Sequence, residues 1–82
     1  MVSLVEMKVN RIGIIKSLGE GVQFQAKMNS LNVRIGKKLK KISNSILKGP
    51  VVVEVDNTRV AIGWGMAKRV FLEVIDENSP DG

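Results

Sequence analysis

The sequence contains no cysteine and no histidine. The first absence excludes disulfides, thiolate metal sites and cysteine nucleophiles, and the second removes the commonest general base and metal ligand. No tyrosine is present, and the three aromatic residues are Phe24, Trp64 and Phe71. No apolar run approaches the roughly 20 residues that a membrane-spanning helix needs. Without a carboxylate pair placed for acid–base chemistry, we expect a binding or accessory role rather than an enzyme, with no cofactor.

The 82 residues suffice for one domain, which we place at residues 1–76, followed by a loose polar tail at 77–82. The net charge is +5, but the charge is unevenly distributed. Residues 7–48 hold ten basic residues and one acid, whereas residues 49–82 hold three basic residues and six acids. This asymmetry indicates either a basic face for an acidic partner or a lysine-rich solvated surface.

A hairpin is the clearest local signal. Residues 50–56, PVVVEVD, and residues 58–62 flank Asp56-Asn57, two residues that tolerate positive φ. A two-residue turn places Val53 opposite Val60 and Val51 opposite Ile62, so that both apolar sets share one face. The agreement between turn and pattern predicts this register.

The remaining elements are a helix and three further strands. Phe24, Met28 and Leu31 are spaced as one face of a helix over residues 22–31. Residues 11–18 predict a strand in which Gly13 marks a bend or a close backbone approach, and residues 69–75 predict a last strand with Val70, Leu72 and Val74 inward. The prediction is a mainly β fold, a small, highly curved barrel of about five strands with one short helix between the first two.

Residues 36–43, GKKLKKIS, fit strict alternation poorly. Either a β-bulge resets the phase or the strand lies at a sheet edge, where lysines block edge-to-edge pairing. Alternation sends Lys38 and Lys40 one way and Lys37 and Lys41 the other. Because both sets reach water only at an edge, we expect an exposed edge strand.

Several segments together resemble the FeoA family of small SH3-like barrels, which accompany the FeoB ferrous iron transporter. The matching segments span residues 4–75: Leu4 to Ile15, LNVRIG at 31–36, Gly49-Pro50 and AIGWGMAKRV at 61–70. Asn10 and Asn32 replace family glycines, and asparagine is the other residue that best accepts the left-handed conformation. The resemblance implies a cytoplasmic, non-enzymatic protein that associates with the GTP-binding region of the transporter and supports iron uptake.

The candidate sites differ in kind. Ferrous iron favours imidazole and carboxylate ligands, and the chain has no histidine, so we expect no stable metal site. Too few aromatics are present for a proline-rich peptide groove, and none lies between Gln25 and Gly63 to stack on nucleic acid. The glycines around Trp64 predict a tight turn that inserts Met66 to close one end of the barrel. The predicted partner-binding residues are Arg34, Lys37, Lys38, Lys40, Lys41 and Trp64, with the lysines alternatively a solubilising edge and Trp64 alternatively packed.

Two alternatives remain from the residues. One is a basic small barrel that binds nucleic acid, which the missing aromatics make the weaker reading. The other is a free-standing relative of the SH3-like domain of iron-dependent repressors, although the chain has no helix-turn-helix to accompany it.

Overall fold

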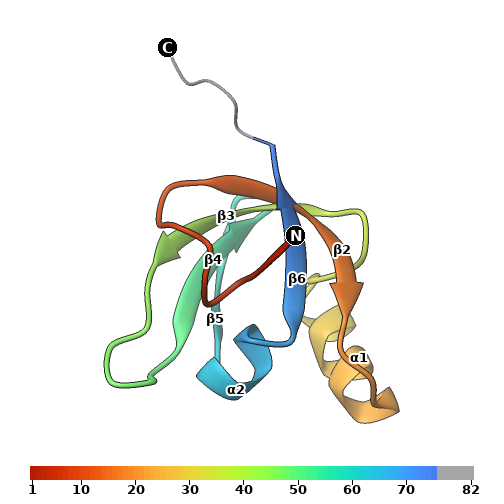
Figure 1. Cartoon of the computed structure of the whole chain (residues 1–82). Helices are drawn as coiled ribbons and strands as arrows, with labels where there is room; N and C mark the ends of the chain where they lie inside the picture. The colour runs from red at the N-terminus through yellow and green to blue at the C-terminus, as the bar shows by residue number, and fades with distance from the viewer. Residues whose placement is uncertain (76–82) are drawn as a thin grey trace.

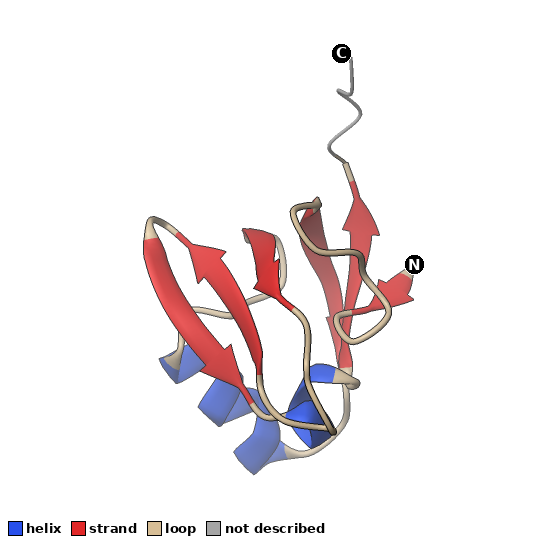
Figure 2. Cartoon of the chain, turned by 90° about the vertical axis from the view of Figure 1, so that its left-hand side faces the viewer, coloured by secondary structure: helices blue, strands red, loops and turns tan. Residues whose placement is uncertain are grey.

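The computed structural model describes residues 1–75 as one antiparallel sheet curled into a barrel, with two helices at one end (Figures 1 and 2). The strand order is β1-β6-β2-β3-β4-β5. The elements are β1 (Val2–Ser3), β2 (Ile12–Leu18), α1 (Val22–Ser30), β3 (Lys38–Ser43), β4 (Val51–Val55), β5 (Thr58–Ile62), α2 (Trp64–Ala67) and β6 (Val70–Val74). The predicted mainly β barrel is confirmed. The structure contains two elements that the sequence did not predict, β1 and α2. The two residues of β1 are too few to show a pattern. The predicted polar tail lies outside the described residues.

The β4–β5 hairpin forms as the sequence predicts. Asp56 and Asn57 have φ values of 51° and 65°, as a two-residue hairpin turn requires. Val53 lies opposite Val60, and Val51 lies opposite Ile62. The predicted register is therefore confirmed.

The helix α1 covers one end of the barrel with the predicted stripe. Phe24 and Met28 are buried, and Leu31, just after the helix, packs partly against the core. The chain leaves the helix through Asn32, whose φ is 66°, and the Val33 N–H donates to the Met28 carbonyl oxygen at 2.8 Å. Asparagine thus supplies the left-handed residue that ends the helix.

The paired strands β2 and β6 approach each other closely at Gly13. A methyl group there would lie 3.2 Å from both the Glu73 carbonyl oxygen and the Leu72 Cβ. The predicted close backbone approach is confirmed. In β6, Val70 and Leu72 are buried, but Val74 is partly exposed, so the inward prediction for Val74 was wrong. The strand leaves the core at this point.

The segment predicted as a tight turn around Trp64 is the short helix α2. Ala67 is fully buried there, and Met66 packs partly against the core. The segment therefore closes one end of the barrel mainly through Ala67. No helix in the described part of the chain is long and apolar enough to cross a membrane.

Candidate functional site

The lysine-rich strand β3 lies inside the sheet, between β2 and β4. The prediction of an edge strand was therefore wrong. A bulge between Lys41 and Ser43 opposite β4 resets the phase, which was the other option left by the sequence. Leu39 and Lys41 point into the barrel, whereas Lys38 is exposed and Lys40 is half-buried opposite Glu54.

Lys41 is fully buried, so its prediction as a partner-binding residue was wrong. Its ammonium group donates to the carbonyl oxygens of Val5, at 3.0 Å, and Met7, at 2.5 Å. Its own carbonyl oxygen accepts the Asn10 N–H at 2.7 Å. Burial lowers the pKa of Lys41 from its usual value of 10.5. The residue ties the N-terminal loop, residues 4–11, to the barrel.

Lys37 is engaged by an acid of the chain itself. Its ammonium group lies 2.5 Å from Asp56 Oδ2, and the Asn32 side-chain amide donates to the same oxygen at 2.8 Å. These hydrogen bonds lower the pKa of Asp56, with the Lys37 bond the larger cause. The network joins the segment after α1 to the hairpin turn. Lys37 therefore already pairs with an acid of its own chain in the absence of a partner.

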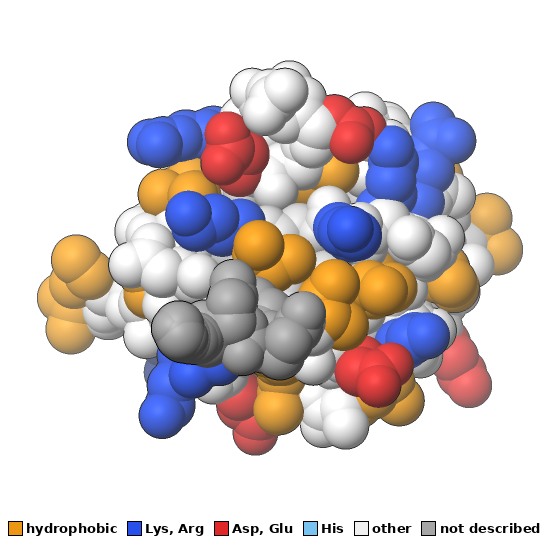
Figure 3. Space-filling view, turned by 90° about the horizontal axis from the view of Figure 1, so that it is seen from above, with side chains coloured by type: hydrophobic (Ala, Val, Ile, Leu, Met, Phe, Trp, Pro, Cys, Tyr) orange, Lys and Arg blue, Asp and Glu red, His pale blue; other side chains and the backbone are white. Residues whose placement is uncertain are grey.

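Arg34 and Lys38 are the exposed members of the predicted cluster. On the end of the barrel opposite the helices, basic side chains are spread out with acidic ones between them (Figure 3). Among the predicted residues, Lys41 is buried, Lys37 is paired with Asp56 and Lys40 lies opposite Glu54, so the structure does not gather them into one basic patch.

Trp64 is half-buried and lies at the base of α2. The ammonium groups of Lys48 and Lys68 lie 5.1 Å and 4.6 Å from the centre of its ring, within cation–π distance. Neither lysine was among the predicted contact residues. Lys68 lies four residues after Trp64, a spacing that a helix brings together, whereas nothing in the sequence shows that Lys48 reaches the ring from the β3–β4 loop.

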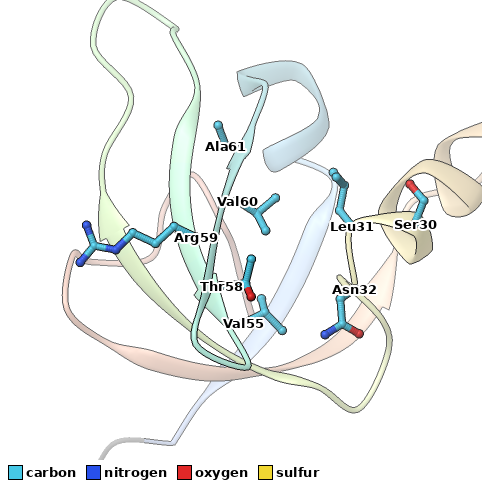
Figure 4. Close-up of a pocket in the computed structure, with 8 residues that line it drawn as sticks. All are labelled: Ser30, Leu31, Asn32, Val55, Thr58, Arg59, Val60 and Ala61. Atoms are coloured by element: carbon cyan, nitrogen blue, oxygen red, sulfur yellow. The ribbon is translucent and has the colours of Figure 1, made fainter.

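The strongest candidate for a binding surface is a groove between the end of α1 and β5 (Figure 4). Its volume is about 510 Å³, and Val60 points from β5 toward the α1 side, while the Arg59 side chain points away. The lining residues are Ser30, Leu31, Asn32, Val55, Thr58, Arg59, Val60 and Ala61. The groove thus has an apolar wall beside a strand.

That strand is the last in the sheet order, so its outer edge is unpaired. In a two-residue hairpin the residues beside the turn form a hydrogen-bonded pair, and pairing alternates from there. Val55–Thr58 and Val53–Val60 therefore bond across the hairpin, whereas Arg59 and Ala61 direct their N–H and C=O groups outward. No turn or loop backbone hydrogen bond in residues 1–75 involves these two residues. The groove offers free main-chain donors and acceptors to an extended segment.

The sequence did not reveal this groove. Residues 58–62 predict a hairpin strand, but the order of strands in the sheet, and hence the free edge, follows from contacts between distant segments. No group of three or more histidine, cysteine, aspartate or glutamate side chains in residues 1–75 is placed to hold a metal ion.

Comparison with known proteins identifies the relatives of this barrel. Residues 2–74 match the family model of the FeoA domain. The chain is 33% identical over 60 residues to "Putative Fe(2+) transport protein A" of Methanocaldococcus jannaschii, an alignment covering 73% of this chain and 71% of that protein.

Solved structures agree. A crystal structure described as an iron uptake regulatory protein, FeoA, superposes with a TM-score of 0.81 at 30% identity, covering 90% of this chain and 96% of that one. The manganese regulator SloR superposes with a TM-score of 0.80 at 16% identity, covering 90% of this chain and 34% of that one, a likeness of fold.

Proposed function

This chain belongs to the FeoA family, and we propose that it is a non-enzymatic accessory protein of ferrous iron uptake, acting in the cytoplasm on the GTP-binding region of an FeoB-type transporter. The family match supports the role in iron transport. The absence of histidine and cysteine, the side chains that most often serve as metal ligands and nucleophiles, is consistent with a role in binding a protein.

The observation that carries the proposal of a protein partner is the unpaired edge of β5 beside an apolar groove. An extended segment that adds to a sheet edge gains main-chain hydrogen bonds from the strand, and its alternate side chains enter pockets for specificity. Here the outward groups of Arg59 and Ala61 supply the main-chain bonds, and Leu31 with Val60 supplies apolar contact. We propose that a segment of the transporter's cytoplasmic region binds in this way.

The test is titration of the purified protein with the transporter's GTP-binding domain, measured by calorimetry. Ala61→Pro removes an outward N–H that the sheet does not use. We expect it to weaken binding about tenfold or more, because an acceptor of the partner would be left without its donor in the complex. Ala61→Val is the matched control, since it keeps the N–H at the same exposed position. Absence of binding by the wild-type protein would refute the partnership. If Ala61→Pro and Ala61→Val both bound as tightly as the wild type, the partnership would stand and only the proposed binding site would be wrong.

The exposed basic residues remain a second proposed contact. We propose that Arg34 and Lys38 add long-range attraction to an acidic partner surface, which salt would screen. Lys38→Gln should then slow association at low salt and have little effect at high salt. Lys40 is a poor position for charge reversal, because a glutamate there would lie directly opposite Glu54.

A further inference from the structure

The β3–β4 loop, residues 44–50, carries the most exposed aliphatic pair of the described chain. Ile46 and Leu47 expose 81% and 97% of their surface. The loop extends beside α2 at the same end of the barrel as the helices (Figures 1 and 2). Two adjacent aliphatic side chains at the tip of a projecting loop are costly in water and indicate an apolar environment that covers them.

The backbone holds this loop in a defined shape. Leu47 and Lys48 have φ values of 53° and 61°, in the left-handed region that residues with side chains rarely occupy. The Gly49 N–H closes the turn by donating to the Ile46 carbonyl oxygen at 2.9 Å, and a methyl group at Gly49 would lie 3.0 Å from that oxygen. The turn therefore presents Leu47 outward at the cost of local strain.

The surroundings of the loop are cationic. Lys48 in the loop and Lys68 at the end of α2 both lie over the ring of Trp64. The flanking segments, residues 42–53 and 57–72, contain no acidic residue. A convex apolar tip, two lysines and a half-buried tryptophan are the combination of side chains that membrane interfaces select.

We propose that the β3–β4 loop inserts Ile46 and Leu47 into the interfacial layer of an anionic bilayer, with Lys48 and Lys68 facing the lipid headgroups. A bilayer fits better than a protein pocket for two reasons. The apolar pair is almost fully exposed at the tip of the loop, and every formal charge on the two flanking segments is positive. This inference rests on the loop and does not require the transporter. It places the barrel at the membrane surface, with the two helices toward the lipid.

The test uses vesicles without any protein partner, made of phosphatidylcholine with or without phosphatidylglycerol. We expect cosedimentation with the anionic vesicles at low salt, and a blue shift in the emission of Trp64, the single tryptophan. Ile46→Ser/Leu47→Ser should weaken partitioning about tenfold or more, because it removes the apolar contribution. Ile35→Ser is the matched control, because Ile35 is also an exposed aliphatic residue, at 64%, but lies outside both helices and the β3–β4 loop.

The charges are tested separately. Because a lysine close to an anionic surface strengthens binding about fivefold, Lys48→Gln/Lys68→Gln should weaken it about twenty-five-fold. Lys8→Gln/Lys16→Gln removes the same charge from exposed positions outside the loop and both helices, and should have a smaller effect. Thermal unfolding of each variant confirms that it is folded.

Failure of the wild-type protein to bind anionic vesicles would overturn the proposal, as would unchanged binding by the serine variant. If the serine variant instead lost binding to the transporter's GTP-binding domain in the absence of lipid, the loop would be a protein contact and the membrane assignment wrong. The proposed association with the transporter is measured without vesicles, so the two proposals fail independently.

Discussion

The ammonium group of Lys41 lies 2.5 Å from the carbonyl oxygen of Met7, which is 34 residues earlier in the chain. A buried lysine is uncommon because its charge must leave water, and carbonyl oxygens replace the lost solvation here. The bond fixes the N-terminal loop, whose side chains Leu4 and Met7 belong to the core.

The first prediction concerns this lysine. Lys41→Met keeps most of the buried volume but leaves the carbonyl oxygens of Val5 and Met7 without their donor, so it should lower the free energy of unfolding by ~1–3 kcal/mol. Urea unfolding measures the change. Lys38→Met, on the exposed side of β3, should change it by less than about 0.5 kcal/mol. A Lys41→Met protein as stable as the wild type would mean that charge burial cancels both hydrogen bonds.

The second prediction is a pH dependence. Burial lowers the pKa of Lys41 in the folded state, so between that value and 10.5 the unfolded chain binds more protons. The penalty of burying the charge is fully present below this window and disappears as the pH rises through it. The stability of the wild type relative to Lys41→Met should therefore increase in alkaline solution, as followed by urea unfolding over a pH series. A constant difference would contradict the assignment.

The third prediction concerns Asp56. Hydrogen bonds from Lys37 and Asn32 hold the pKa of this carboxyl below its usual value of 3.8, so its stabilising effect is present above that value and disappears as the pH falls through the lowered pKa. Asp56→Asn keeps a residue suited to the positive φ but removes the titration. The stability of the wild type relative to Asp56→Asn should fall in acid. Glu20→Gln, at an exposed acid outside the network, is the control variant.

The fourth prediction concerns the helix. Met28 is fully buried between α1 and the sheet, and Met28→Ala should reduce stability by ~2–5 kcal/mol through lost burial and a residual cavity. Val22→Ala, at an exposed position of the same helix, should have little effect. Chemical denaturation of the two variants side by side gives the comparison. A small loss for Met28→Ala would mean that the helix is loosely docked.

The fifth prediction is that the protein does not hold ferrous iron. The chain has no histidine or cysteine, the usual strong ligands, so anaerobic titration with Fe²⁺ should give no stoichiometric binding at micromolar concentration. A saturable site with one ion per chain would contradict this and would require a cluster of carboxylates.

The parts of the fold that the sequence predicts are those governed by neighbouring residues. The turn at Asp56-Asn57 fixes the hairpin register, and the spacing of Phe24 and Met28 fixes the buried face of the helix. Asparagine at position 32 ends the helix as expected. In each case, residues a few positions apart carry all the information.

The parts that escaped prediction depend on which strands become neighbours. A lysine-rich strand resembles an edge strand, and nothing local shows that β2 and β4 flank it or that Lys41 finds carbonyl partners in the N-terminal loop. The open edge of β5 likewise depends on the order of strands in the sheet, and Lys48 reaches Trp64 from 16 residues earlier in the chain. The candidate surfaces therefore required the three-dimensional arrangement.

The burial of Lys41 also makes it a chemical reporter. An amine-reactive reagent modifies exposed lysines at once, but it reaches this one only after the carbonyl oxygens of Val5 and Met7 have moved away. The rate at which mass spectrometry finds Lys41 acylated thus counts the openings of the N-terminal loop. The acylation rate can be compared with and without a partner or vesicles. A change in that rate would show that binding at the helical end of the barrel alters how often the N-terminal loop opens.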